Sequence, residues 1–369
     1  MRRPPLKTKV SKFMKILIVG DGASKIHEVA IYEAFKKMGH QAGHFFWHQY
    51  FHSEHWIANV WLRFQNKFLF GPRLASLNSD LISVAQKQEP DLIFIYRGTH
   101  VYPKTIRRIK NKLPNCLIYG YNNDNPFSSG HPSWLWRNFL RSLPAYDIVF
   151  AYRHENLRDF LRMGAKKALL LRSWYLPEFH KFSFLPHPSE KQYECDCVFV
   201  GHFEDDGRTA CIEILLENKV NVRVFGPYKG LGKSGWDVPV KKSEILQRLL
   251  PINYLTGRSY VDAISSTPIA LCFLSKLNHD TYTRRCFEIP AIGAALFSEY
   301  SDDLATLFVD GEEAVFFRNK NELLEKVVYY LAHPNELDCL RRRGHERVVR
   351  DGHDIYTRLS SVVELVQVL

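Results

Sequence analysis

This sequence has no apolar run long enough to cross a bilayer. A transmembrane helix needs about 20 consecutive apolar residues, and no window of the 369 residues approaches that length. Residues 1–15 are basic but hold no apolar core, so we expect no secretory signal. Hydrophobic residues make up 46% and charged residues 24%, which is the composition of a folded globular protein.

The sequence also lacks the cysteine pattern of a disulfide framework. Its seven cysteines are an odd number and lie scattered through a long chain. Only Cys195 and Cys197 are close together, and no second pair of Cys or His residues has the spacing of a zinc site. We therefore expect buried, reduced thiols and a cytoplasmic protein.

Two glycine-rich segments depart from the cofactor motifs that they resemble. Gly20-Asp-Gly22 follows a predicted strand, but Lys25 stands where the dinucleotide fingerprint has its third glycine. The segment 226–234 resembles a phosphate-binding P-loop whose first glycine is one residue too far away. Gly235 and Pro239 oppose the helix that a P-loop needs. These departures argue against a nicotinamide cofactor and against a P-loop NTPase, and we expect no cofactor.

The acidic residues do not form a pair suited to a metal–diphosphate site. Such a site prefers two carboxylates that flank one residue in a loop, whereas Asp205-Asp206 and Asp302-Asp303 are adjacent pairs. The second pair is typical of the capped N-terminus of a helix. The histidines form no compact ligand cluster. The sequence therefore predicts no metal site.

Positive charge is abundant, with a formal net charge of +11. A basic surface favours anionic ligands such as nucleotides, phosphates, acidic lipids or nucleic acid. No RNA-recognition or DNA-binding motif is present, so we expect no nucleic-acid partner. Arg343, Arg347 and Arg350 share one face of a predicted helix. That face is either solvated or contacts an anionic membrane, and the second interpretation would make the protein peripheral at the inner face of the membrane.

Strand and helix patterns alternate through the chain twice. Apolar runs that end in glycine, such as 15–20 and 197–201, are typical of buried parallel strands. The proline-rich segment 177–194 interrupts the alternation. The pattern predicts an α/β fold with two doubly wound, Rossmann-like domains that face a central cleft. Ligands of such sheets bind at the carboxyl ends of the strands.

The predicted boundaries follow from these breaks. We expect a disordered basic tail at 1–13, after which Met14 is a possible true start. The further segments are an N-terminal Rossmann-like domain at 14–176, a linker at 177–194, a C-terminal Rossmann-like domain at 195–340 and a basic helical region at 341–369.

The segment 279–293 carries the most informative pattern. Asp280 precedes Glu288 by eight residues, and Glu288 falls on a helix that begins near Tyr282. Arg284 and Arg285 stand at the start of this helix. Arginines and free backbone N–H groups at a helix start can bind a phosphate. The alternative interpretation is a capped helix with a surface ion pair.

This segment resembles the C-terminal half of CgeB-like (spore maturation protein) glycosyltransferases. The resemblance extends from about Val198 to Arg350, with family-like residues also at 146–167. The strings that carry it are Arg285-Cys-Phe-Glu-Ile-Pro-Ala291, Leu296-Phe-Ser-Glu299, Phe308 to Phe317 and Glu322-Leu-Leu. The resemblance implies a GT-B architecture with an N-terminal acceptor domain and a C-terminal domain that binds a nucleotide sugar.

The resemblance also implies roles for single residues. Asp280 and Glu288 keep the spacing of the E-x7-E motif of this group, with aspartate in place of the first glutamate. Glu288 would bind the ribose hydroxyls, and Asp280 would lie near the donor sugar. His202 stands where many relatives have an arginine. The implied donor-nucleotide site comprises Gly201, His202, Arg208, Tyr282, Arg285 and Glu288.

Asp124 is the candidate on the acceptor side. It lies in the polar cluster 119–127 at the end of a predicted strand, near the place of an aspartate–proline motif in the family. Asp124 would act as a base for the acceptor hydroxyl or would orient the acceptor. The alternative interpretation is an Asx-rich turn before Pro126.

The resemblance predicts a metal-independent glycosyltransferase of the hexosyltransferase type, active in glycan biosynthesis. It would move a sugar from a nucleoside diphosphate sugar to a hydroxyl of a glycan or lipid-linked acceptor. Arg208, Arg285 and helix N-termini would stabilise the leaving diphosphate. The alternatives are a nucleotide-sugar epimerase or hydrolase on the same fold, and a non-catalytic binder of nucleic acid or membrane surfaces.

Overall fold

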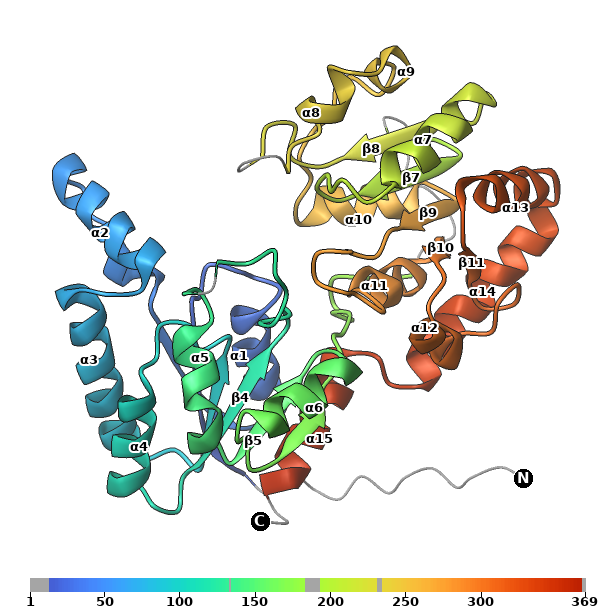
Figure 1. The fold of residues 1–369 in the computed structure, drawn as a ribbon. Coiled ribbons are helices and arrows are strands. Elements are labelled where there is room, and N and C mark those ends of the chain that lie inside the picture. Colours follow the sequence, from blue (N-terminus) through green and yellow to red (C-terminus); the bar gives the residue numbers. More distant parts are fainter. Residues whose placement is uncertain (1–12, 133, 183–192, 231–233, 367–369) are drawn as a thin grey trace, which may run out of the picture. The chain divides into compact units, whose positions relative to one another are not determined.

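The computed structural model describes residues 13–132, 134–182, 193–230 and 234–366, and it divides the chain into two compact units (Figure 1). Unit 1 comprises Met1–Arg172 and Ile355–Leu369, and unit 2 comprises Ser173–Asp354. Most of the predicted tail and most of the predicted linker lie outside the described residues. The division differs from the sequence-based one at the C-terminus, because residues 341–354 belong to unit 2 and the last helix returns to unit 1.

Unit 1 is built on a parallel sheet. Its described strands are hydrogen-bonded in the order β2-β1-β3-β4-β5-β6, and every pairing is parallel. The strands are β1 (Lys15–Gly20), β2 (Gln41–Phe46), β3 (Leu92–Tyr96), β4 (Leu117–Asn122), β5 (Ile148–Ala151) and β6 (Ala168–Leu170). The strand order reverses between β1 and β3, and the carboxyl ends of strands at such a switch point are where ligands of doubly wound sheets bind.

Helices accompany this sheet. They are α1 (Glu28–Lys37), α2 (Trp56–Phe68), α3 (Pro72–Gln88), α4 (Pro103–Lys112), α5 (Arg137–Ser142), α6 (His154–Arg162) and α15 (Ile355–Val366), with short 3-10 turns at His48–Phe51 and Leu143–Ala145. β3 is buried along its whole length, as its continuous apolar run predicts for an inner parallel strand. α15 packs against α1, so the C-terminal helix completes the unit that the N-terminal part of the chain begins.

Unit 2 repeats the architecture with a shorter parallel sheet. Its described strands follow the order β11-β10-β9-β7-β8. They are β7 (Cys197–Val200), β8 (Val222–Phe225), β9 (Ile269–Cys272), β10 (Ala295–Glu299) and β11 (Val315–Phe317). The helices are α7 (Arg208–Glu217), α8 (Asp237–Val240), α9 (Glu244–Gln247), α10 (Arg258–Ser265), α11 (Arg285–Ile292), α12 (Asp302–Leu307), α13 (Lys320–Ala332) and α14 (Pro334–Arg350).

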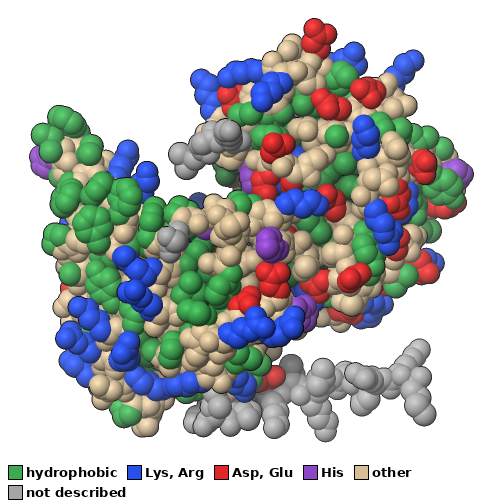
Figure 2. Space-filling model, viewed as in Figure 1, with side chains coloured by type: hydrophobic (Ala, Val, Ile, Leu, Met, Phe, Trp, Pro, Cys, Tyr) green, Lys and Arg blue, Asp and Glu red, His purple; other side chains and the backbone are tan. Residues whose placement is uncertain are grey.

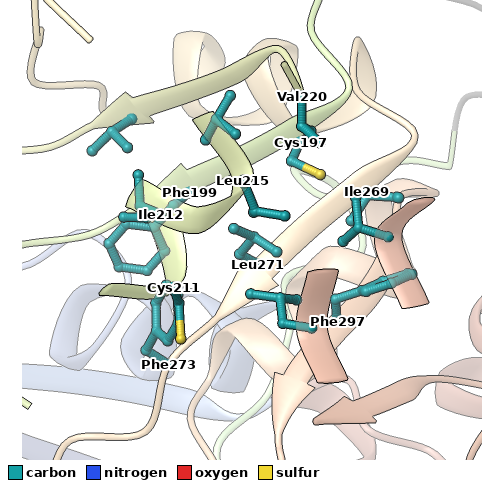
Figure 3. Close-up of a cluster of buried hydrophobic side chains, with 14 of the residues drawn as sticks. Cys197, Phe199, Cys211, Ile212, Leu215, Val220, Ile269, Leu271, Phe273 and Phe297 are labelled. Atoms are coloured by element: carbon teal, nitrogen blue, oxygen red, sulfur yellow. The ribbon is translucent and has the colours of Figure 1, made fainter. Parts of the chain in front are cut away.

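A buried cluster holds α7 against the sheet of unit 2. Figure 3 shows Ile212 and Leu215 of α7 beside Phe199 of β7 and Leu271 of β9. All four side chains are essentially inaccessible to water. Burying large apolar side chains is the main favourable term in folding, so this cluster supports the loops at the carboxyl ends of β7 and β9.

The basic helix α14 packs within unit 2 and its arginines are already engaged. Arg341 is buried, and its Nε donates to the carbonyl oxygen of Gly293 at 2.6 Å, just after the C-terminus of α11. Arg347 pairs with Glu313 at 3.5 Å, and Arg350 pairs with the same carboxylate at 3.4 Å. A cation that meets the carbonyl end of a helix is stabilising. These contacts tie the arginines to their own unit, while Arg343 and Arg350 stay 58% and 60% exposed, so membrane contact by this face stays a prediction.

The cysteines are free thiols, as the scattered pattern predicts. Six are buried, but Cys339 is exposed on α14, which corrects the expectation that all of them are buried. Among the described residues, no helix is both long and apolar enough to span a bilayer.

Candidate donor-binding site

Glu288 lies in the first turn of α11 and is surrounded by polar partners from three parts of unit 2. The Tyr260 hydroxyl on α10 donates to Oε2 at 2.8 Å. Arg284 places its Nε 2.5 Å from Oε1, and the Nε2 of His180 lies 3.6 Å from the same oxygen. The Glu288 side chain is only 2% exposed. This cluster holds a charge in a buried place by surrounding it with a guanidinium and hydrogen-bond donors.

The partners decide the ionisation of this cluster. Burial alone would raise the pKa of the Glu288 carboxyl, but the charge of Arg284, with His180 and Tyr260, lowers it below its ordinary value. Burial lowers the pKa of His180, so this imidazole is neutral near pH 7. Its Nδ1 accepts a hydrogen bond from the backbone N–H of Leu176, which leaves the Nε2 hydrogen toward Glu288.

Gly201 forms a tight turn directly after β7. A Cβ added at this glycine would lie 2.6 Å from the Phe199 ring and 3.1 Å from Nη2 of Arg285. The Gly201 carbonyl accepts a hydrogen bond from Nε1 of Trp236 at 2.8 Å. A Cβ at Gly226, after β8, would overlap that same carbonyl oxygen. Glycine is therefore required at both positions because two strand ends and an arginine meet there.

Arg285 is the cation at this turn. Its Cζ lies 5.9 Å from the centroid of the Phe199 ring, and its helix begins at the same residue. Within the described part of the chain, no carboxylate lies at ion-pair distance from its guanidinium. Arg285 thus joins a glycine turn and a helix N-terminus, a combination suited to an anionic group.

Arg208, by contrast, is fully engaged. Its Nε donates to Oδ1 of Asp206 at 2.8 Å, and its Nη1 donates to the carbonyl oxygen of His202 at 2.6 Å. The residue is 3% exposed and lies beside the Phe199 ring. These contacts assign Arg208 to holding the loop 202–206. The contact of Arg208 with the diphosphate stays a prediction, and it would require Arg208 to share or give up these contacts.

His202 belongs to the same loop network. Its Nε2 lies 2.7 Å from Oε1 of Glu204, and the Ser275 hydroxyl donates to Oε2 of Glu204 at 2.7 Å. Burial would raise the pKa of Glu204, but the hydrogen bonds from His202 and Ser275 and the charge of Arg208 lower it. His202 is half exposed and remains accessible from solvent.

Two predicted site residues, Tyr282 and Asp280, lie just before α11. Tyr282 is fully buried, its ring packs against Phe287, and its hydroxyl accepts a hydrogen bond from the Ser173 backbone. Tyr282 therefore has a packing role in the fold, and its contact with the donor stays a prediction. Asp280 is half-buried in the loop, and its backbone N–H donates to the carbonyl of Ser275 at 2.9 Å.

Asp124 lies in unit 1, after β4, and forms an ion pair. Its Oδ2 is 2.6 Å from Nη2 of Arg97, a non-glycine residue with a left-handed φ of 63°. The backbone N–H of Asp124 donates to Oδ1 of Asn122 at 3.1 Å, which is the Asx turn of the alternative interpretation. Asp124 is therefore both part of this turn and a partly exposed carboxylate beside a cation.

Sequence reasoning missed two residues. His180 falls in the predicted linker, and no local pattern marks it as a partner of Glu288. Glu28 begins α1, is 3% exposed, and its Oε2 has no hydrogen-bond partner among the described residues. A Cβ at Gly20 would overlap Cγ of Glu28, so the glycine that ends β1 makes room for this carboxyl. Gly20 was therefore the feature of the sequence that could have indicated a buried side chain next to the end of β1.

The carboxyl edge of the sheet in unit 1 holds further unsatisfied groups. The Nδ2 of Asn122, at the end of β4, and the Oδ1 of Asn123, directly after it, are buried atoms without a hydrogen-bond partner within the described part of the chain. Burial raises the pKa of Glu28. Unpaired buried polar atoms are costly, and at the end of parallel strands they are positioned for a polar ligand.

Among the described side chains, no group of three or more His, Cys, Asp or Glu residues could hold a metal ion.

Residues 208–364 match the family model described as glycosyl transferase-like. No curated protein matches the chain by sequence.

Solved structures match nearly the whole chain. HepE of Anabaena, solved with UDP-glucose, has a TM-score of 0.67 at 14% identity, over 96% of this chain and 100% of that one. Sucrose-phosphate synthase of Thermosynechococcus elongatus has a TM-score of 0.68 at 12% identity, over 96% of this chain and 98% of that one. A glycosyltransferase of Rickettsia africae has a TM-score of 0.68 at 11% identity, with the same two coverages.

This chain has the GT-B fold. The structural likeness shows the fold, and the family match adds a glycosyl transferase-like region that contains α7 to α14. Beyond the fold, the family match supports a glycosyl transferase-like activity for the part of the chain that it covers. The predicted fold class is confirmed.

Proposed function

We propose that this protein transfers a sugar from a nucleoside diphosphate sugar to an acceptor hydroxyl and that unit 2 binds the donor at the start of α11. The observation that carries the donor site is Arg285. It combines a cation without a carboxylate partner among the described residues, a glycine turn at the end of β7 and a helix N-terminus. HepE was solved with UDP-glucose, which makes UDP-sugars the first donors to test.

The donor would engage two groups on α11. Arg285 would contact the diphosphate, and Gly201 would let the phosphate approach the backbone without a Cβ in the way. Glu288 would accept from the ribose hydroxyls. Because its carboxylate is held by Arg284 and Tyr260, binding would replace or share the contact with Arg284, whose side chain is 25% exposed.

The chemistry of the donor side follows from charge. As the bond to the sugar breaks, negative charge grows on the leaving diphosphate. A guanidinium and backbone N–H groups that already point to that place stabilise the charge without rearrangement. We propose that this makes transfer independent of a metal ion. Asp280, in the loop before α11, would contact the donor sugar.

On the acceptor side we propose the carboxyl edge of the sheet in unit 1. Asp124 would orient the acceptor hydroxyl or accept its proton. The neighbouring unsatisfied side chains of Asn122 and Glu28 supply further hydrogen-bonding groups for a polyhydroxyl acceptor. A glycan or a lipid-linked saccharide is such an acceptor, and peripheral membrane contact would suit the second. Among proteins with the GT-B fold, we propose that this chain is related to the CgeB-like proteins, because residues 285–291 resemble their sequence.

Titration calorimetry with UDP, GDP, ADP and TDP sugars tests the donor site. Arg285→Gln should weaken binding of the preferred donor about tenfold or more, because a hydrogen bond to a charged group contributes about 1.5–3 kcal/mol. Arg248→Gln, an exposed arginine of the same unit, is the matched control and should bind as the wild type does. Unchanged affinity in the Arg285 variant would reject the proposed diphosphate contact.

Product analysis tests the reaction. With the donor and a panel of saccharide acceptors, the proposal expects a new glycosidic product, and activity should persist in EDTA. Release of free sugar as the main product, whatever the acceptor, would instead identify a hydrolase. Loss of activity in EDTA that Mg²⁺ or Mn²⁺ restores would overturn the metal-independent mechanism.

A further inference from the structure

Helix α2 presents an apolar face that the described residues of its unit leave uncovered. Trp56 is 76% exposed and Ile57 is 67% exposed. In Figure 1 the N-terminal end of α2 extends beyond the rest of unit 1. We call the following residues the α2 face: Trp56, Ile57, Val60, Trp61, Phe64 and Phe70. At 3.6 residues per turn, the five that lie on the helix cover an arc of about 140°.

The opposite side of the helix fixes it to unit 1. Leu62 and Gln65 are buried. The Oε1 of Gln65 accepts from the backbone N–H of Arg73 at 2.9 Å, and the Oδ1 of Asn66 lies 2.7 Å from Nε2 of the buried His100. The orientation of α2 is therefore set by its polar and buried side. Helix α2 therefore packs on unit 1 through the side opposite the α2 face.

The rings on the exposed side contact one another. The Trp61 and Phe64 rings stack with centroids 5.6 Å apart, and Phe64 lies 4.7 Å from Phe68 and 5.6 Å from Phe70. Aromatic side chains bury large apolar areas, and tryptophan is favoured where an apolar phase meets water. Monomeric soluble proteins rarely expose so many large apolar side chains together, so this patch marks an interaction surface.

The charge around the α2 face has one sign. The sequence holds no Asp or Glu between Glu54 and Asp80, whereas Arg63, Lys67 and Arg73 lie in this stretch. On the helix, Arg63 and Lys67 fall beside Trp56 at one edge of the apolar arc. Figure 2 shows hydrophobic side chains over α2, with Lys and Arg side chains over the neighbouring helices of unit 1. Exposed cations on α4, which packs near α3, are Lys104, Arg107 and Arg108.

We propose that the α2 face docks this protein on an anionic lipid bilayer. The rings would enter the boundary between headgroups and acyl chains, and Arg63 and Lys67 would contact anionic headgroups at its edge. A second copy of the chain fits less well, because self-pairing of the face would bring these cations near those of the partner. The arginines of α14 do not serve this purpose, since Arg347 and Arg350 already pair with Glu313.

Co-sedimentation of the full chain with vesicles tests the proposal. We expect binding to vesicles of phosphatidylcholine with phosphatidylglycerol at low salt and weaker binding at high salt, because headgroup attraction is screened. Vesicles of phosphatidylcholine alone should bind markedly less. A protein that ignores anionic vesicles at low salt overturns the proposal.

Paired variants assign the contact to the α2 face. Trp56→Ser with Trp61→Ser should weaken vesicle binding about tenfold or more, since both rings leave the bilayer contact. Tyr254→Ser, an exposed aromatic residue of unit 2, is the matched control and should bind as the wild type does. Both changes are at exposed positions, and thermal unfolding will show that the fold persists. Equal binding by the tryptophan variant would overturn the assignment.

Charge and depth provide two further readouts. Arg63→Gln with Lys67→Gln should reduce both the affinity for anionic vesicles and its salt dependence. The control Lys219→Gln with Arg248→Gln has the same net charge and should reduce neither.

Brominated lipids should quench tryptophan fluorescence in the wild type. Trp56→Phe with Trp61→Phe should keep vesicle binding and lose most of that quenching. Sedimentation velocity tests whether a second copy of the chain occupies the α2 face instead. If the protein self-associates, if Trp56→Ser with Trp61→Ser abolishes this self-association, and if vesicles are not bound, the α2 face is a dimer contact and the proposal is overturned.

Discussion

Each unit buries a glutamate in the first turn of a helix, and the two carboxyl groups have opposite surroundings. Glu288 of unit 2 has Tyr260, Arg284 and His180 around it, and its pKa is lowered. Glu28 of unit 1 has an oxygen without a partner among the described residues, and burial raises its pKa. The difference teaches that burial does not decide the charge of a carboxyl group; the cations and donors packed around it do.

The largest expected effect comes from removing the satisfied carboxylate. Glu288→Ala leaves Arg284 and the Tyr260 hydroxyl without their acceptor, and breaking a mostly buried ion pair costs about 3 kcal/mol. The free energy of unfolding, from denaturant titration, should fall by roughly that amount, and donor binding should weaken as well. Glu325→Ala, at an exposed position of α13, is the control and should change stability by less than about 0.5 kcal/mol. A small loss of stability in Glu288→Ala would mean that its partners do not stabilise the carboxylate, and Glu288 would then not differ from Glu28 in this respect.

A smaller loss should follow when one donor to Glu288 is deleted. Tyr260→Phe keeps the ring and removes the hydroxyl that donates to Oε2 at 2.8 Å. Hydrogen bonds to charged groups contribute about 1.5–3 kcal/mol, and Arg284 and His180 remain, so we expect about 1.5 kcal/mol. Tyr254→Phe changes the same group at an exposed position and should be neutral. A neutral Tyr260→Phe would show that the remaining partners suffice for the carboxylate.

The pH dependence of stability separates the two glutamates by sign. The folded-state pKa of Glu288 lies below its unfolded value of about 4.5, so its contribution is present above that pH and is lost as the pH falls through the folded-state pKa. The folded-state pKa of Glu28 lies above its unfolded value, so its contribution is present below about pH 4.5 and is lost as the pH rises through the folded-state pKa. Denaturant titrations that extend from neutral pH to well below about pH 4.5 should therefore show a flatter acid side in Glu288→Gln, because the Glu288 contribution changes only in that range.

The smallest effect is expected at the unsatisfied glutamate. Glu28→Gln keeps the shape and removes the charge that burial disfavours, so stability at pH 8 should change by less than about 1 kcal/mol, in the stabilising direction. Glu33→Gln, on the exposed side of the same helix, is the control. Loss of several kcal/mol in Glu28→Gln would mean that the carboxyl group has a partner that accounts for its burial, and the two sites would then be alike.

The elements of the fold follow from local patterns. The apolar runs at 15–20 and 197–201, which predicted buried parallel strands, form β1 and β7. Helices α8 and α9 span four residues each, and elements this short leave little periodic signal in the sequence. Strands and long helices are read well because their periodicity repeats several times.

The candidate site was only partly accessible to this reasoning. Arg285 and Gly201 were expected near each other, and the distances at the Gly201 turn bring them together. Arg208 was expected to bind phosphate, but Asp206, two residues before it, holds its guanidinium. The identity of an arginine indicates what it is able to bind, whereas its nearest carboxylate decides what it does bind.

The sequence by itself determined the two runs of parallel strands, the glycines at strand ends and the helix that carries Glu288, because each depends on residues close together in the chain. Only the tertiary structure decided which charges are paired. It joined the arginines of α14 to the acids at 312–313, brought His180 to Glu288, and left the rings of α2 exposed. Burial and ion pairing are long-range, since they depend on which distant segment packs against a side chain, and no local pattern records that neighbour.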